Sequence, residues 1–566
     1  MFYLIGVTFQ IIYFEIQILT KRHFRVKKNY MKFLQPVLLL LLLANLSLNA
    51  QILTESNLPI IIIDTDSNEI PDEPKIPAIM GIIDNGVGQI NKIDNVFNHY
   101  DGHIGIETRG NSTQLYEKKT YTIELWDEAE NEISEPLLGM GKEEDWILHA
   151  MVLDKTQLRV PLCFDLFRKM GHYAADYRYV ELIVDGEYQG VYILTEKLKR
   201  DDDRVDIAKL DEDDIAGDSL TGGYILRIDW TWDVQEEDLF ESNYESQGGI
   251  PMKYQWYYPK PDKIKQEQKE YISNYIHDFE DAAFGPDFTN QAGLRYTDYI
   301  DLNSFVDFVI INEFAKNSDG YKLSSYMHKD KDSKGGKLTA GPIWDFDQSY
   351  GLSTVCSSHN PLGWIYLKNQ EGCGDLGTMP LWWRVMMEDP IFINRLDCRW
   401  KEFRSSFLQL DSLFQWMDTQ TTLLEDPLGR NFERWDFIGN NIWFEPFPIP
   451  ETYDEEINYM KNWIQDRLEW MDANMFGNCD EDITNTKEVL SDNNFSFAPN
   501  PTMDNIRLYN LKGERILIHD AKGKMHISTP INASEKRLDL STLSNGIYFI
   551  TVEAAGNRIT KKLIVL

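Results

Sequence analysis

The sequence predicts an α+β protein with a β-rich N-terminal segment, a large mixed middle part and a small C-terminal β-sandwich. Short apolar stretches in which every second residue is polar, as in strands, occur early in the chain and again over 495–566. Residues 381–475 show the three- and four-residue apolar spacing of helices instead. With 566 residues, 43% of them hydrophobic and 13% aromatic, the chain is too long for one core and too apolar to be largely disordered.

Residues 1–50 form a predicted signal-peptide region. Residues 31–51 combine a basic start, a short apolar run and small residues that allow cleavage after Ala50. The apolar run is too short to cross a bilayer, so we expect no stable membrane span in the mature form. Residues 1–30 carry a second apolar stretch. It is either a signal anchor or, as we favour, an over-extended gene start with Met31 as the true initiator.

Charge and cysteine usage narrow the function classes. The net charge of −35 argues against a nucleic-acid partner, because phosphate recognition needs clustered Lys and Arg. None of the five cysteines lies in a C-x-x-C pair, which argues against a structural zinc site. Cys356 and Cys373 bracket a Gly-rich segment and are able to form a disulfide in an oxidising compartment, but the sequence leaves the pairing open. The odd count leaves at least one thiol unpaired.

The first elements follow from apolar spacing and turn residues. Within the β-rich segment 51–100, the runs LPIIIIDT and PAIMGIIDN predict two buried strands. A helix is predicted over 154–171, with Asp154 as its cap. A hairpin follows over 179–198, and Asp185-Gly186 forms its turn.

The remaining elements belong to a domain predicted over 101–477. A clear helix is predicted over 304–317, and a strand pair over 322–347 follows it directly. Residues 478–494 are polar and predict a linker. The alternation of short strands with Asp, Asn and Gly turns then predicts the sandwich over 495–566.

Two aspartates, Asp345 and Asp347, are the strongest candidates for metal ligands. They lie two residues apart in the stretch GPIWDFDQSYG. On an extended strand such side chains point to the same side, so both are able to hold one hard cation. The alternative is a turn at a strand end whose carboxylates are satisfied by the protein itself.

Asp319 is the candidate base. It follows the helix predicted over 304–317 and precedes a strand. A carboxylate at such a junction is able to accept a proton or orient a nucleophile. The alternative role is that of a cap or turn residue.

A polar turn supplies the candidate phosphate site. Arg109, Gly110 and Ser112 lie in the turn RGNSTQ, whose backbone N–H groups are able to cradle a phosphate. Lys118 and Lys119 start the next strand, from which a lysine reaches phosphate oxygens as a point charge. Such turns are also common without any ligand. The chain contains neither a P-loop nor an H-R-D motif.

The order of these parts is that of a bilobal kinase: phosphate turn, lysine, linker, base, metal aspartates. Several stretches in this order resemble CotH-type kinases of Bacteroidota over roughly residues 55–475; they include RGNSTQ, KKTYTIEL, DWILHA, VELIVDGEYQGVYILTEKLKRDDDRVDI, AKNSDGYKLSSYMHKDKDSKGGKL and GPIWDFDQSYG. The resemblance implies a divergent bilobal protein-kinase-like fold, secretion, and chemistry with ATP and Mg²⁺ or Mn²⁺.

The resemblance assigns roles to individual residues. Asp319 matches the catalytic aspartate, and Asp345 matches the metal-binding aspartate. Lys118 or Lys119 matches the lysine at the phosphates, and Glu196 lies where a hinge meets adenine.

Two positions depart from the family pattern. Ser324 stands where conventional kinases place a second metal ligand, a role left to Asp347. Val160 replaces an expected polar residue, which leaves the role of 154–160 open.

The C-terminal stretches PNPTMDNIRL, LDLSTLSNGIYFITV and KKLIVL resemble a type IX secretion sorting domain. This implies the type IX secretion machinery as a partner, and export through the periplasm and across the outer membrane to the cell surface or medium. The alternative is an ordinary adhesive β-module.

Two function classes remain. The first is a secreted atypical protein kinase that transfers the ATP γ-phosphate to Ser or Thr of exported or surface proteins. The second is a non-catalytic adhesin or matrix protein that keeps the fold for binding. Joint retention of Asp319, Asp345 and the lysine pair favours the first.

Deletion of residues 495–566 should block surface delivery. We expect the truncated protein to accumulate in the periplasm, with a mature N-terminus near Gln51. Fractionation and N-terminal sequencing measure both outcomes, with the full chain as control. Normal surface delivery of the truncated chain would contradict the sorting role.

Overall fold

The computed structural model describes residues 53–231, 234–245, 251–370, 379–479, 496–498, 502, 505–509, 511, 514–520, 524–554 and 557–565. The predicted signal region 1–50 and most of the predicted linker 478–494 lie outside these residues. The chain divides into two compact units, and the boundary in the sequence falls between Gly477 and Asn478. Each unit is described by itself.

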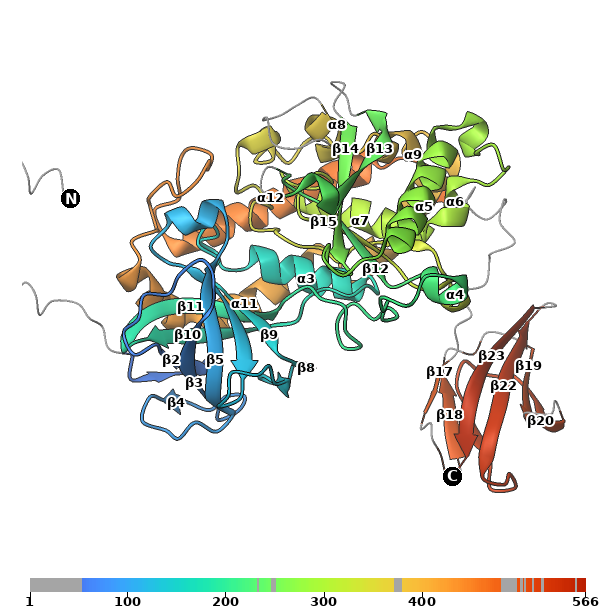
Figure 1. Ribbon diagram of the computed structural model, residues 1–566, viewed down its shortest axis with the longest axis horizontal. Helices are drawn as coiled ribbons and strands as arrows, with labels where there is room; N and C mark the ends of the chain where they lie inside the picture. Colours follow the sequence, from blue (N-terminus) through green and yellow to red (C-terminus); the bar gives the residue numbers. More distant parts are fainter. Residues whose placement is uncertain are drawn as a thin grey trace, which may run out of the picture. The chain divides into compact units, whose positions relative to one another are not determined.

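The first unit begins with a closed barrel of seven strands, which Figure 1 shows in blue to green. Around the barrel the strands are β10 (Tyr177–Val184), β11 (Glu187–Glu196), β9 (Asp145–His149), β6 (Thr120–Trp126), β5 (Tyr100–Arg109), β3 (Ile76–Ile83) and β2 (Ile60–Asp64). Parallel pairing of β2 with β10 closes it, and all other pairs are antiparallel. The short strands β1 (Glu55–Ser56), β4 (Asn91–Lys92), β7 (Glu135–Pro136) and β8 (Lys142–Glu143) pair at its rim.

Period-two patterning explains the barrel. In β6, for example, Ile123 and Leu125 face a buried cluster inside the barrel, whereas Glu124 lies on the outer face. The segment 51–100, which the sequence analysis set apart from the main domain, supplies β2 and β3. The structure therefore joins that segment to the same barrel.

The rest of the first unit combines a five-stranded sheet with helices. The sheet runs β13 (Leu239–Glu245), β14 (Pro251–Tyr258), β12 (Tyr224–Ile228), β15 (Ser325–Lys329), β16 (Leu338–Ala340). The helices are α3 (Arg159–Lys169), α4 (Gly217–Leu220), α5 (Gln266–Phe284), α6 (Tyr296–Tyr299), α7 (Leu302–Ala315), α8 (Ile365–Gln370), α9 (Trp382–Met386), α10 (Pro390–Arg404), α11 (Leu410–Arg434) and α12 (Tyr453–Asn474). The predicted hairpin, the α7 helix, the strand pair and the helical character of 381–475 are confirmed.

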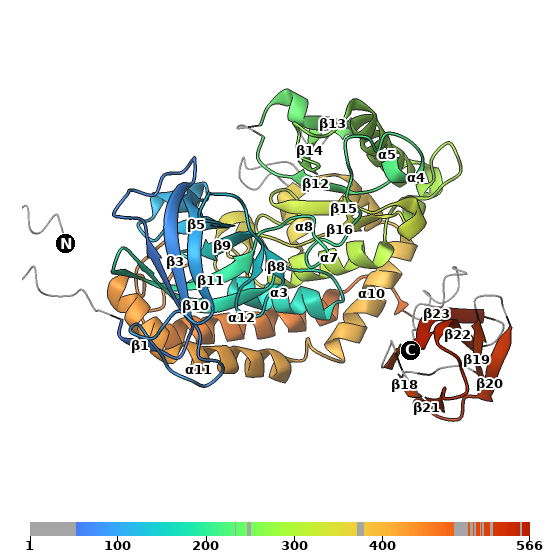
Figure 2. The ribbon, with the colours of Figure 1, turned by 60° about the horizontal axis from the view of Figure 1, so that its bottom comes forward.

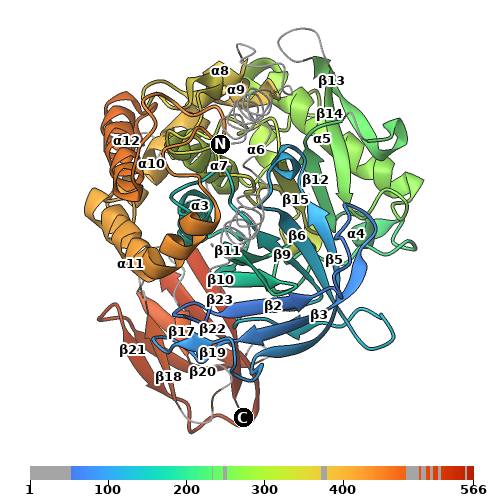
Figure 3. The same cartoon turned by 90° about the vertical axis from the view of Figure 1, so that its left-hand side faces the viewer.

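Helices α3 and α11 join the barrel to the helical part. Figure 2 shows α11 beneath the barrel, where the Trp435 indole just after this helix donates to the Gln189 carbonyl of β11 at 2.8 Å. Gly190 has φ +101°, and a Cβ there would meet Asn431 of α11 at 2.4 Å. A glycine is thus needed for this close approach. Figure 3 shows α3 between the barrel and α7, and its apolar residues share the main core.

The first helix starts later than predicted. The spacing favoured a helix over 154–171, but α3 begins at Arg159. The Asp154 carboxylate accepts hydrogen bonds from the Thr156 N–H at 3.0 Å and the Arg159 N–H at 2.8 Å. Gln157 has φ +59°. This side-chain-centred turn replaces the first helical turn, because Asp competes with the backbone for its hydrogen bonds.

A buried ion pair holds the helical part together. The Glu313 carboxylate of α7 lies 3.3 Å from an Arg467 guanidinium nitrogen of α12. It also accepts hydrogen bonds from the Ile365 N–H at 2.7 Å, the Tyr366 N–H at 2.9 Å and the Tyr321 hydroxyl at 3.1 Å. Arg467 also donates to the carbonyls of Glu313, Pro361 and Gly363. Nearly all polar atoms of the pair are thus satisfied inside the core.

The second unit is a β-sandwich. One sheet contains β17 (Ser496–Ala498), β18 (Asn505–Tyr509) and β21 (Lys536–Asp539). The other contains β20 (Met525–Pro530), β19 (Arg515–Asp520), β22 (Gly546–Ala554) and β23 (Asn557–Val565). Residues of both sheets share one hydrophobic cluster.

The state of the cysteines and the absence of a stable membrane span in the mature form were also predicted. Cys163 is a buried free thiol, whereas Cys356, Cys398 and Cys479 are disulfide-bonded. Cys373 lies outside the described residues, so its pairing with Cys356 stays open. Within the described ranges, no helix has both the length and the apolar character needed to cross a membrane.

Replacing one member of the Glu313–Arg467 pair should destabilise the first unit strongly. We expect Arg467→Met to cost about 3–5 kcal/mol, because it leaves Glu313 buried without its counter-charge. Glu313→Gln should cost less, since Arg467 keeps its three carbonyl acceptors. Denaturant unfolding of both single variants and the double variant measures the coupling. Strictly additive effects would contradict a direct interaction.

Candidate active site

The two candidate metal ligands lie on a loop. Strand β16 ends at Ala340, because Gly341 has φ +109° and Pro342 lacks the N–H that a further ladder bond needs. Asp345 has φ +56°, a left-handed conformation. The expectation that Asp345 and Asp347 project from an extended strand is therefore wrong.

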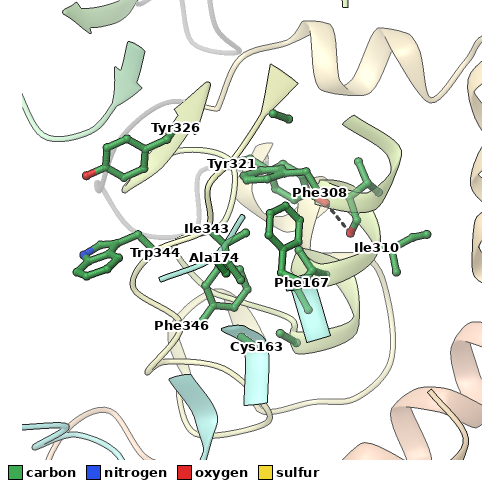
Figure 4. Close-up of a cluster of buried hydrophobic side chains, with 14 of the residues drawn as sticks. Cys163, Phe167, Ala174, Phe308, Ile310, Tyr321, Tyr326, Ile343, Trp344 and Phe346 are labelled. Carbon is green, nitrogen blue, oxygen red and sulfur yellow. Dashed lines mark hydrogen bonds between the residues drawn. The ribbon is translucent and has the colours of Figure 1, made fainter. Parts of the chain in front are cut away.

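Hydrophobic anchors place this loop. Figure 4 shows Ile343 and Phe346 in a buried cluster with Phe167 of α3 and Phe308 of α7. Because Phe346 points into the core, its neighbours Asp345 and Asp347 remain partly accessible. A sequence that alternates apolar anchors with aspartates thus presents two carboxylates at the core edge.

Asp319 is tied to the same loop through polar contacts. Helix α7 ends where Lys316 adopts φ +49°. The Asn317 side chain then accepts from the Asp319 N–H at 3.2 Å and donates to the Asp345 carbonyl at 3.3 Å. The Ser324 hydroxyl donates to the Asp345 carboxylate at 2.6 Å. The residue that stands where a metal-binding Asn was expected therefore contacts a candidate metal ligand.

The three carboxylates lie close enough to repel one another. Burial, and then the charges of Asp345 and Asp319, raise the pKa of Asp347 to about 8. Burial is also the main cause that raises the pKa of Asp319 to about 6, and Asp345 adds to it. Burial likewise raises the pKa of Asp345. Oxygen ligands that share excess negative charge suit a hard divalent cation, but the ligand atoms of these three aspartates do not all lie within 4.8 Å of one another.

Two residues at this site were missed by the sequence analysis. Asp229 follows β12, and its charge raises the pKa of Asp319 and Asp345. Lys322 opposes the rise in the Asp319 pKa, and burial lowers the pKa of Lys322 itself. Lys322 was detectable from its place three residues after Asp319. Asp229 had no local signal beyond ending a strand, since antiparallel pairing of β12 with β15 brings it to the site.

The predicted phosphate turn reaches the site through Arg109. This arginine ends β5, and its guanidinium carbon lies 6.0 Å from the ring centre of Trp344, next to Asp345. Its charge opposes the rise in the Asp345 pKa. Gly110 has φ +113°, and a Cβ there would meet the Thr113 hydroxyl at 2.1 Å. Ser112 begins the 3₁₀ turn Ser112–Leu115 that follows.

The two candidate lysines have different surroundings. Lys118 is buried, and its ammonium donates to the Val191 carbonyl at 2.7 Å and to Asn431 at 3.1 Å. Burial lowers its pKa to about 7. Lys119 is half-buried and donates to the Gln114 carbonyl at 2.5 Å, inside the predicted phosphate turn. Lys119 therefore lies at the turn, whereas Lys118 binds β11 to α11.

Glu196 ends β11, where the chain leaves the barrel. Its carboxylate accepts hydrogen bonds from the Tyr173 hydroxyl and the Asp176 N–H, each at 2.9 Å. Burial raises its pKa. The predicted contact of Glu196 with adenine stays a prediction, and the protein itself occupies the carboxylate oxygen Oε2.

The segment 154–160, whose role was open, supports the aspartate loop. Arg159 is buried, pairs with the Asp154 carboxylate, and donates to the Ser349 carbonyl at 2.9 Å. The Ser349 hydroxyl in turn donates to the Phe346 carbonyl at 2.6 Å. Arg159 thus fixes the loop from behind.

A second acidic group lies at the barrel rim. The ligand atoms of Glu143, Glu144 and Asp145 lie within 4.8 Å of one another. Lys199 contacts all three carboxylates, at 2.9 Å for Glu143 and 3.1 Å for Asp145, and Lys197 contacts Asp145 at 2.9 Å. These two lysines offset most of the charge of the three carboxylates, and the ion pairs fasten the segment after β11 to the barrel.

Comparison with known proteins identifies the families to which the two parts of the chain are similar. The model of the CotH kinase protein family matches residues 106–471, more than half of the chain, so the protein belongs to the CotH kinase family. The model of a secretion system C-terminal sorting domain matches residues 496–566. No curated protein matches the chain. The predicted resemblances are confirmed.

The sorting domain implies contact with the type IX secretion machinery and export across the outer membrane to the cell surface or medium.

The two lysines should respond differently to substitution. Lys118→Met should cost about 1–3 kcal/mol of stability, because buried acceptors lose their donor, and should change nucleotide affinity less than about twofold. Lys119→Met is the matched control. It should have a larger effect on nucleotide affinity than on folding stability. Melting temperature and nucleotide affinity are measured on both variants. If Lys118→Met abolished binding without a loss of stability, Lys118 would be the phosphate ligand.

Proposed function

We propose that this protein is a secreted, metal-dependent atypical protein kinase. It transfers the ATP γ-phosphate to Ser or Thr hydroxyls of exported or surface proteins. The observation that carries this proposal is that the Asn317 side chain ties Asp319 to the loop of Asp345 and Asp347. All three aspartates are partly accessible, and Arg109 lies beside them. Membership of the CotH kinase family supports it.

The donor set fits Mg²⁺ or Mn²⁺. Asp345 and Asp347 offer only oxygen ligands, and Ser324 holds one Asp345 oxygen, which orients that carboxylate. A bound divalent cation would neutralise charge on the phosphates. Mutual repulsion among the aspartates would fall at the same time, so nucleotide and cation should bind cooperatively.

Transfer then depends mainly on positioning. The acceptor hydroxyl oxygen forms a bond to the γ-phosphorus while the bond to the bridging oxygen breaks and ADP leaves. Asp319 accepts the proton of that hydroxyl. Arg109 on the barrel side and Lys322 beside Asp319 supply positive charge near the developing negative charge.

A non-catalytic adhesin with the same fold is the second candidate. It draws support from the export route and from the fact that fold alone does not ensure activity. An adhesin has no need of three mutually repelling carboxylates. Such a cluster costs stability without a cation.

Substitution of the aspartates separates the two candidates. Asp345→Ala should abolish metal-dependent nucleotide binding, because the phosphates lose their bridging cation. Asp319→Ala should leave nucleotide binding nearly intact but lower transfer roughly 10²-fold, the usual scale for loss of a positioned base. Asp347→Asn should be milder if Asp345 is the primary ligand.

The measurements are nucleotide affinity with Mg²⁺ or Mn²⁺, transfer from labelled ATP, and melting temperature. Asp332→Ala, in the β15–β16 connection, is the matched control and should change neither binding nor transfer. Wild-type protein that binds no nucleotide with either cation would defeat the kinase proposal and leave the adhesin.

A further inference from the structure

A side chain outside the predicted motifs holds the candidate base. The Gln348 side-chain amide donates to the Asp319 carboxylate oxygen Oδ2 at 3.3 Å. Its carbonyl oxygen accepts from the Trp443 indole N–H at 3.2 Å. Gln348 therefore bridges Asp319 to a residue that lies 95 positions further along the chain.

The indole fixes the orientation of the Gln348 amide. Trp Nε1–H is only a donor, so the atom of Gln348 that faces it must be the carbonyl oxygen. The amide nitrogen then necessarily faces Asp319 and donates to it. Without Trp443 the amide is free to rotate by half a turn and present its oxygen to the carboxylate, which would repel it.

Contacts on both sides hold Trp443 in place. Just before it, the Ile442 carbonyl accepts from the Tyr116 hydroxyl at 2.7 Å. Just after it, the Phe444 carbonyl accepts from the Thr354 N–H at 2.6 Å and the Thr354 hydroxyl at 2.8 Å. Tyr116 follows the predicted phosphate turn, so the segment that carries Trp443 also contacts the other wall of the site.

A buried ion pair fixes the same segment more firmly. The Glu445 carboxylate accepts from the Ile442 N–H at 2.9 Å and lies 2.7 Å from the Lys155 ammonium. Lys155 is fully buried and also lies 3.3 Å from Glu456 of α12. The indole is thus supported by a rigid segment rather than by a free loop.

We propose that Gln348 and Trp443 are positioning residues for Asp319. This inference rests on the proposed kinase function and deepens it. Gln348 holds Oδ2 of Asp319, so that Oδ1 faces the acceptor hydroxyl and receives its proton. Trp443 acts through Gln348 by fixing the direction of its amide.

Steady-state kinetics of the full chain test the proposal. Gln348→Ala should lower kcat about tenfold, because a misaligned base loses part of its usual contribution, while KM for ATP changes less than about twofold. Gln348→Glu should lower kcat further, since a carboxylate replaces the donor. Trp443→Phe, which keeps a ring but removes the N–H, should lower kcat by about threefold or more.

The double variant gives the sharpest result. If Trp443 acts only through Gln348, then Gln348→Ala combined with Trp443→Phe should be no worse than Gln348→Ala alone. Trp435→Phe is the matched control, because its indole donates to the Gln189 carbonyl of β11 instead. Independent, multiplying effects, or equal losses in the control, would overturn the proposal.

A second measurement does not depend on activity. In full-length protein labelled with 5-fluorotryptophan, the Trp443 resonance is assigned with Trp443→Phe. It should shift in Asp319→Ala and in Gln348→Ala, but not in Asp332→Ala. An inactive wild-type protein would refute the kinase proposal alone, whereas an unmoved Trp443 resonance would refute the positioning chain.

Discussion

The helical part of this protein is built around one buried carboxylate. Glu313 accepts hydrogen bonds from the backbone N–H groups of the first two residues of α8 and from the Tyr321 hydroxyl, and it pairs with Arg467. Asp319 lies between the end of α7 and Tyr321, so both ends of its short connection are anchored to the same charge. A site of mutually repelling aspartates needs such a scaffold, because the aspartates themselves add no stability.

Much of the fold was predictable because it depends on local patterns. Alternation of apolar and polar residues predicted β6, and the Asp185-Gly186 pair predicted the β10–β11 hairpin. The apolar run over 304–317 predicted the buried helix α7. The start of α3 was not predictable from spacing. There a side chain, Asp154, takes hydrogen bonds that a helical backbone would otherwise make.

The site was predictable in part for the same reason. Asp319 and Asp345 stand in short motifs joined by one hairpin, so their proximity follows from local topology. The Gln348–Trp443 contact and the approach of Asp229 depend on long-range packing, which no local pattern encodes. Lys118 shows what the position of a residue along the chain leaves open. The resemblance assigned the phosphate lysine to Lys118 or Lys119 without choosing between them. Only the packing, which places the Lys118 ammonium against Val191 and Asn431, distinguishes the two.

The parallel pairing of β2 with β10 has a practical consequence for fragment design. The family match begins at residue 106, inside β5, and leaves out β2 and β3. A recombinant fragment cut to the matched range would retain four complete barrel strands and the end of β5 from Ile106 to Arg109. That remnant and β10 would be open edges. Open edges of this kind pair with other chains. Failure of such a fragment to stay soluble would therefore reflect its truncation point, and activity assays need a chain that begins before Leu53.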